Sequence, residues 1–145
     1  MTAEAPLLTY VEFRSDLFPP YEGEEEAINS GLYGKRLAEF LIAGLRAEGF
    51  ECLEPVAEDW GWRVEIKNAN FPLWIGCGRY QEYPDGFLCF IEPHQPVIRK
   101  LFKKIETRGR IELLQQAMEK LLAVEPGIRA RRWRTHAEFN NTERR

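Results

Sequence analysis

Hydrophobic and charged residues alternate strictly in the middle of the chain, and this pattern predicts β-strands. Residues 62–67 (WRVEIK) place apolar side chains on one face and charged side chains on the other. Residues 73–79 and 86–92 are apolar at nearly every position, which is typical of strands covered on both faces. The connections at 68–72 and 81–86 are short and rich in turn-forming residues. We therefore expect antiparallel hairpins in this region.

Three further segments have the residue types of strands with a less regular pattern. Residues 7–14 and 50–55 carry aromatic and aliphatic side chains and flank the first helix-like segment. Residues 128–134 (IRARRWR) follow a Pro-Gly pair, and their basic side chains suit an exposed edge strand. The stretch 15–30 contains two prolines, a glycine and four glutamates, so we expect a long acidic loop there.

Apolar residues recur with a helical period in three other segments. The stripe at positions 37, 40, 41, 44 and 45 predicts a helix over 31–48, and Gly49 suits its C-terminal turn. Residues 97–105 (VIRKLFKKI) read as a short amphipathic helix with four cations on its outer face. A further helix is expected from Thr107 to about Val124, before Pro126 and Gly127 end it.

These elements occur in the order β-α-β-β-β-β-α-α-β, with consecutive strands between the helices. This order favours an α+β fold over a wound parallel sheet. We expect a single domain over residues 1–139, with a mostly antiparallel sheet of five to six strands and two or three helices packed on it. Residues 140–145 are expected to form a frayed C-terminal tail.

The charge of the chain is unevenly distributed along its 145 residues, although the formal net charge is only −3. Residues 1–94 hold 7 Lys/Arg and 17 Asp/Glu, a balance of −10. Residues 95–145 hold 13 Lys/Arg and 6 Asp/Glu, a balance of +7. This division excludes a uniformly basic nucleic-acid binder but leaves room for one basic docking surface. The alternative is internal pairing, with the acidic segment 22–26 folded against the basic face.

Compartment and cofactor use are constrained by what the sequence lacks. It has no secretory leader pattern and no apolar run of membrane-spanning length, so we expect a small cytoplasmic protein of bacterial type with no membrane partner. Its three cysteines are odd in number and lie in apolar stretches, which disfavours a disulfide framework. Cys52, Cys77, Cys89 and His94 lack the close spacing of a zinc site, so no metal or cofactor is expected.

An aromatic-rich segment, EDWGW at 58–62, offers the first candidate binding site. On a strand, Trp60 and Trp62 would share one face, and Gly61 would allow a close backbone approach. These tryptophans could line a groove for a peptide or an apolar ligand, or they could complete the core. The groove would be completed by Trp74, Tyr80 and Tyr83.

Candidate catalytic groups are few. Cys77 lies between two glycines, and a thiolate there would need Asp59, Glu92 or His94 as a partner. A buried structural cysteine is the simpler interpretation. The carboxylates Glu82, Asp85 and Glu92 surround a turn, where acid–base work would require separated pKa values. Recognised phosphate-binding, serine-hydrolase and zinc-protease motifs are missing from the sequence.

The basic C-terminal part offers the second candidate binding site. It could dock an acidic protein, bind RNA through arginines interleaved with Trp133, or be a solvated surface. The overall acidity of the chain disfavours nucleic acid. The basic candidates are Arg99, Lys100, Lys103, Lys104, Arg131 and Arg132.

The sequence therefore leads us to expect a non-catalytic interaction or ligand-binding module, for example a regulatory or toxin-neutralising partner of another protein. The first alternative is a small enzyme with a cleft around Asp59, Trp60, Trp62 and the Cys77/Glu92/His94 group. The second alternative is an RNA-binding protein that uses the basic C-terminal segment. A homodimer is also expected as an option, because the strands at 73–79 and 86–92 need cover on both faces.

Overall fold

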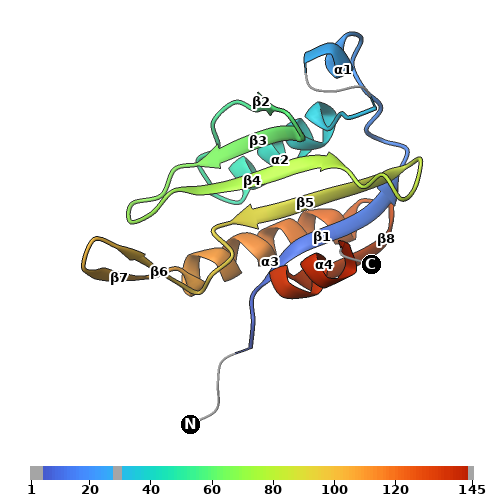
Figure 1. Cartoon of the computed structure of the whole chain (residues 1–145). Coiled ribbons are helices and arrows are strands. Elements are labelled where there is room, and N and C mark those ends of the chain that lie inside the picture. Colours follow the sequence, from blue (N-terminus) through green and yellow to red (C-terminus); the bar gives the residue numbers. More distant parts are fainter. Residues whose placement is uncertain (1–4, 28–30, 144–145) are drawn as a thin grey trace.

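A six-stranded antiparallel sheet forms the body of the protein, which confirms the predicted α+β class (Figure 1). The computed structural model describes residues 5–27 and 31–143. The strand order across the sheet is β2-β3-β4-β5-β1-β8, so the first and last strands of the chain lie side by side. The strands are β1 Leu8–Ser15, β2 Val56–Glu58, β3 Gly61–Ile66, β4 Leu73–Arg79, β5 Gly86–Glu92 and β8 Ile128–Thr135.

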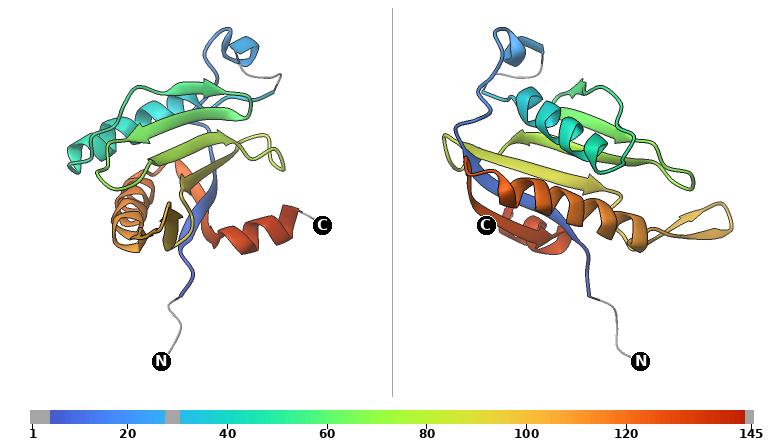
Figure 2. Two further views of the ribbon diagram at one scale, coloured as in Figure 1. Left: turned by 60° about the vertical axis from the view of Figure 1, so that its left-hand side comes forward. Right: turned by 180° about the vertical axis from the view of Figure 1, so that it is seen from behind.

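Two long helices cover one face of this sheet, as the turned views in Figure 2 show. They are α2, Lys35–Ala47, and α3, Arg108–Val124. The core lies between them and the sheet, and it takes every second side chain of the strands, including Val11 and Phe13 of β1 and Ile75 and Cys77 of β4. We call the side of the sheet that packs against α2 and α3 the helix-covered face, and the opposite side the open face.

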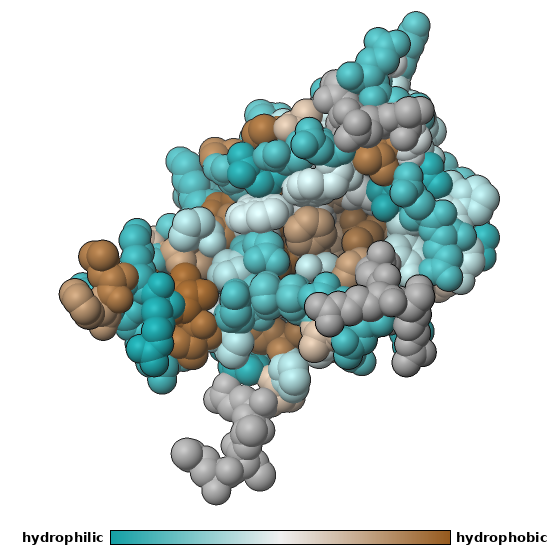
Figure 3. All heavy atoms as spheres, in the orientation of Figure 1, coloured by the Kyte–Doolittle hydropathy of each residue, from teal (hydrophilic) through white to brown (hydrophobic). Residues whose placement is uncertain are grey.

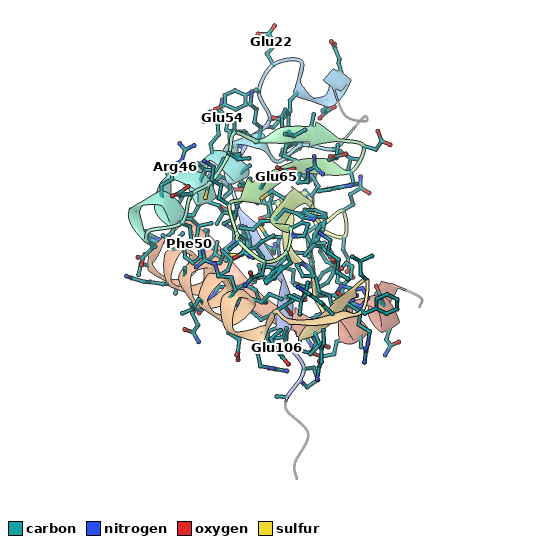
Figure 4. The ribbon with its side chains drawn as sticks, turned by 90° about the vertical axis from the view of Figure 1, so that its left-hand side faces the viewer. Glu22, Arg46, Phe50, Glu54, Glu65 and Glu106 are labelled. Atoms are coloured by element: carbon teal, nitrogen blue, oxygen red, sulfur yellow. The ribbon has the colours of Figure 1, made fainter. Side chains whose placement is uncertain are left out.

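The strand prediction for residues 50–55 is wrong. This segment is a connection that makes a single bridge, Cys52 to Ile66, and the strand that follows it is β2. Arg46 of α2 holds the segment by donating to the Cys52 carbonyl oxygen at 2.9 Å and by pairing with Glu54 at 3.2 Å (Figure 4). The helix end therefore fixes the connection, which leaves its backbone only partly paired with β3.

The helix prediction for residues 97–105 is also wrong, because these residues form a β-hairpin. It consists of β6, Val97–Lys100, and β7, Lys103–Glu106, joined at Leu101 and Phe102. The segment is nearly symmetrical about this turn, so the two strands place Ile98 opposite Ile105. A nine-residue segment is too short to hold a helix by propensity alone. The pairing lets both isoleucines pack on the core.

The C-terminal residues differ from the predicted tail. Residues 136–143 form helix α4, His136–Glu143, while residues 144–145 lie outside the described part of the chain. The Phe139 ring of α4 stacks on Tyr10 of β1 at a centroid distance of 4.6 Å, which attaches the helix to the open face. The predicted edge strand is present as β8, which pairs with β1.

The acidic segment at 22–26 contains a short helix, α1, Glu24–Ala27. It lies at the opposite end of the molecule from the β6–β7 hairpin (Figure 1). The glutamates therefore do not cover the basic residues 99–104. Residues 28–30 of the predicted loop lie outside the described part of the chain.

Candidate functional site

Three aromatic rings form a cluster on the open face of the sheet. Trp60, from the turn before β3, lies 6.0 Å from Trp74 of β4 and 5.2 Å from Phe90 of β5, measured between ring centroids. A side chain at Gly76 would overlap the Phe90 ring, so this glycine leaves the space that the ring occupies. Figure 3 shows pale and brown atoms gathered in the middle of this face.

The expectation that Trp60 and Trp62 share a face is wrong. Trp60 belongs to the turn, so strand alternation starts only at Gly61. Trp62 is opposite Cys77 in the register and is buried on the helix-covered face. Its indole nitrogen donates to Glu24 at 2.9 Å. The close approach expected at Gly61 is confirmed, because a Cβ atom there would overlap the Cys77 carbonyl oxygen.

Tyr80 and Tyr83 lie at the other end of β4 and are separate from the tryptophans. Their rings are 6.3 Å apart, and both line a cavity of about 240 Å³ together with Arg14 and Arg132. The Arg14 guanidinium lies over the Tyr83 ring at 4.6 Å. A hydrogen bond to Glu82, together with burial, raises the pKa of the Tyr80 hydroxyl, so this phenol is neutral at physiological pH.

The candidate nucleophile Cys77 is not brought together with its candidate carboxylate partners. Cys77 and Cys89 are paired residues of β4 and β5, and both are fully buried on the helix-covered face. Burial, and then the neighbouring Cys77, raises the pKa of the Cys89 thiol. Strand alternation in β5 places Glu92 on the open face, and Asp59 lies in the turn before β3. Strand alternation therefore separates Cys77 from its expected carboxylate partner.

His94 and Glu92 do meet, in a cluster with a residue that the sequence did not single out. The His94 Nδ1 atom is 3.1 Å from Glu92, and the ring stacks on His136 of α4 at 3.5 Å between centroids. Burial, and then His94, lowers the pKa of His136. Within residues 5–27 and 31–143, no group of three or more His, Cys, Asp or Glu side chains is placed to hold a metal ion.

The candidate carboxylate Asp85 is held in ion pairs that connect strands of the sheet. It accepts a hydrogen bond from Arg14 at 2.8 Å and pairs with Arg129 of β8. The Arg14 guanidinium holds the pKa of the Asp85 carboxyl below its ordinary value. Asp85 thus ties the β4–β5 turn to the two neighbouring strands.

Arginines of β8 are likewise engaged within the fold. Arg134 pairs with Glu12 at 2.9 Å, and Arg131 pairs with Glu119 of α3 at 2.6 Å. The Trp133 indole also donates to Glu119, at 2.9 Å. The division of charge along the chain is therefore partly internal pairing, although the acidic partners are not the glutamates at 22–26.

The basic residues of the β6–β7 hairpin differ from those of β8. The hairpin carries four cations: Arg99, Lys100, Lys103 and Lys104. Within the described part of the chain, the only ion pair that they make is between Lys104 and Glu106, at 3.9 Å. The register places Arg99 opposite Lys104 and Lys100 opposite Lys103, so like charges face each other across both rungs. Like charges in directly opposed positions destabilise a β-ladder.

The tip of this hairpin is apolar and fully displayed to solvent. Leu101 is 91% exposed and Phe102 is fully exposed. Figure 3 shows hydrophobic atoms at this end of the molecule, next to hydrophilic ones. Leu101 also has a φ of 58°, a left-handed conformation that strains a leucine and suits asparagine or glycine. The near-symmetry of residues 97–105 was the sequence signal that could have revealed this hairpin.

Comparisons with protein-family models, curated proteins and solved structures give no match. Within the described residues, no helix combines the length and the apolar character that a membrane crossing requires.

Proposed function

We propose that this protein is a small, non-enzymatic interaction module of the cytoplasm that binds an acidic protein through its β6–β7 hairpin. In this proposal the partner has a carboxylate-rich surface with an apolar pocket. Leu101 and Phe102 enter that pocket, and the four cations around them contact the rim. A regulatory or toxin-neutralising role is one form of this mode of action, because a protein that acts by occupying a partner's surface needs no catalytic residues.

The observation that carries the proposal is that the hairpin concentrates three features that are unfavourable in the isolated chain. Its tip displays a leucine and a phenylalanine, its turn holds Leu101 in a strained conformation, and its rungs oppose like charges. Aromatic side chains are enriched at the core of protein interfaces, and charges of one sign near them attract a partner of the opposite sign. An acidic partner would relieve the repulsion and bury both apolar side chains.

Site-specific photo-crosslinking in cells that naturally make the protein tests this proposal. A benzophenone amino acid replaces Phe102, and a matched control replaces Val124, which is exposed at the end of α3. We expect a discrete adduct from position 102 only, formed with a protein of net negative charge. Charge reversal by K103E and K104E should abolish the adduct.

Several outcomes would refute the proposal. They are the absence of an adduct at position 102, equal labelling from position 124, and persistence of the adduct after charge reversal. An adduct that nuclease treatment removes would favour the alternative of RNA binding.

A further inference from the structure

An open groove lies beside the basic hairpin. It has a volume of about 510 Å³ and runs between the loop joining β3 to β4 and Lys100 of β6. Figures 1 and 2 both place this loop and the hairpin next to each other. Figure 4 looks at this end of the molecule, with Glu65 on the sheet side and Glu106 on the hairpin side. The groove therefore continues the surface of the hairpin.

The lining of the groove combines cations with aromatic and aliphatic side chains. Its cations are Arg63, Lys67 and Lys100, and its single carboxylate is Glu65. Arg63 is neutralised locally by Glu58 and Glu65 at 3.5 and 3.4 Å. Lys67 has a partner in Glu51 at 3.7 Å, but both side chains of that pair are well exposed to solvent. Such a pair is weak and exchanges readily with an incoming carboxylate.

Trp74 forms part of the apolar lining, together with residues such as Leu53 and Phe71. It is half-buried, and its other side packs on Phe90 at 5.6 Å and on Trp60 at 6.0 Å between ring centroids. The Arg63 guanidinium lies 5.9 Å from the Trp74 ring centroid. A fixed indole next to cations suits a ligand that carries an aromatic or aliphatic side chain among carboxylates.

From this juxtaposition we infer that the groove binds an extended acidic peptide segment with an apolar residue that packs on Trp74. The inference rests on the proposed function, because Lys100 belongs both to the groove and to the hairpin. It adds the chemistry of the partner: the segment bound next to the hairpin is linear, carries several carboxylates, and has one apolar side chain within them.

Binding of synthetic peptides to the purified full chain tests this inference. The probe is a fluorescein-labelled peptide of sequence EEEEFEEEE, and its controls are QQQQFQQQQ and EEEESEEEE. We expect saturable binding of the first peptide, with a fluorescence anisotropy change that weakens as salt rises. Each control should bind about tenfold less tightly or worse, since one lacks the charges and the other lacks the ring.

Variants of two matched lysines locate the binding site. Lys67 and Lys120 are each 65% exposed and each pair with one glutamate, but Lys120 lies on α3, away from the groove. The substitution Lys67→Glu should weaken peptide binding about fivefold, and Lys120→Glu should leave it within about twofold. The variant Trp74→Leu should weaken binding of the phenylalanine peptide and leave that of the serine peptide unchanged.

The possible results separate the two proposals. Three results would refute peptide binding at the groove. They are the absence of saturable binding, equal binding of the glutamine peptide, and equal effects of the two lysine variants. A crosslink at position 102 that survives Lys67→Glu would support the hairpin alone. Peptide binding that requires Lys67, together with no adduct at position 102, would support the groove and refute the hairpin as the partner site.

Discussion

The Trp62 indole nitrogen donates to the Glu24 carboxylate at 2.9 Å, which joins the acidic segment to the third strand. The same carboxylate accepts from the backbone nitrogens of Tyr21, Gly34 and Lys35 at 2.7–2.9 Å. Glu24 is only 5% exposed. One buried side chain therefore fastens the loop, the start of α2 and the strand to each other, and it explains why an acidic residue occurs inside this fold.

Removing the charge at Glu24 should destabilise the protein strongly. Glu24→Gln keeps the shape but replaces one carboxylate oxygen with an NH₂ group, which faces N–H donors instead of accepting from them. We expect a loss of about 2–4 kcal/mol in the free energy of unfolding, measured by urea denaturation. Glu26→Gln, at an exposed position of the same short helix, is the control and should change stability by less than about 0.5 kcal/mol. Equal effects of the two substitutions would show that the Glu24 contacts contribute nothing specific.

A side chain at Gly61 should be poorly tolerated. Its Cβ atom would overlap the backbone carbonyl oxygen of Cys77, and a backbone neighbour cannot move aside cheaply. We expect Gly61→Ala to lower the melting temperature markedly, by the equivalent of about 2 kcal/mol or more. Gly109→Ala is the counterpart, since nothing lies within 4 Å of a Cβ atom there and the residue is in α3. That substitution should stabilise the protein by up to about 1 kcal/mol.

Relieving the strain at Leu101 should separate stability from binding. Asparagine is favoured at a hairpin position with positive φ, so Leu101→Asn should increase hydrogen-exchange protection of the hairpin amides by up to about 1 kcal/mol. The same change should weaken the crosslink from position 102, because a contact side chain is lost. Leu113→Asn, at an exposed position of α3, should leave both readouts of the hairpin unchanged. Unchanged crosslinking with Leu101→Asn would remove that residue from the partner contact.

The stability of the protein should fall as the pH is lowered from about 7.5 to 5. The pKa of His136 is lowered from its ordinary value of 6.5, so the unfolded chain binds a proton more readily than the folded chain does. The stabilisation is present above pH 6.5, and it is lost progressively as the pH falls from there toward the lowered pKa of the folded state. Glu92 opposes this effect, His94 promotes it, and Tyr10 packs on the ring at 5.6 Å.

Urea denaturation at several pH values measures this dependence. The variant His136→Gln should flatten the pH dependence between pH 7.5 and 5. Asp85 does not interfere in this window, because its lowered pKa places its own contribution at more acidic pH. A His136→Gln protein with an unchanged slope would assign the dependence to another group.

Much of the fold follows from local patterns in the sequence. The alternation at 62–67 predicts β3 with its correct faces, and the apolar runs at 73–79 and 86–92 predict β4 and β5. The bounds of those two strands match the predicted ones, because turn-forming residues flank each run. The sequence also predicts the bounds of α3 closely, since Thr107 precedes the helix and Pro126 and Gly127 follow it.

The candidate sites were less predictable because they depend on contacts between distant residues. The spacing of apolar residues in 97–105 fits a helix, whereas the near-symmetry of the segment about Leu101 and Phe102 indicates a hairpin. The packing of Ile98 and Ile105 on the core decides between them. Trp60 and Trp62 are two residues apart, yet a turn that ends at Gly61 sends them to opposite faces. No pattern in the sequence signals where such a turn ends.

The α+β class, the antiparallel strands and the uneven charge can all be predicted from the order of residue types along the chain, because each of them depends on that order. Tertiary structure alone decided which charges are neutralised. Arg134 pairs with Glu12, 122 positions away, because the first and last strands are neighbours in the sheet. The hairpin projects beyond that sheet, so within the described residues the cations at 99, 100 and 103 form no ion pair with a carboxylate.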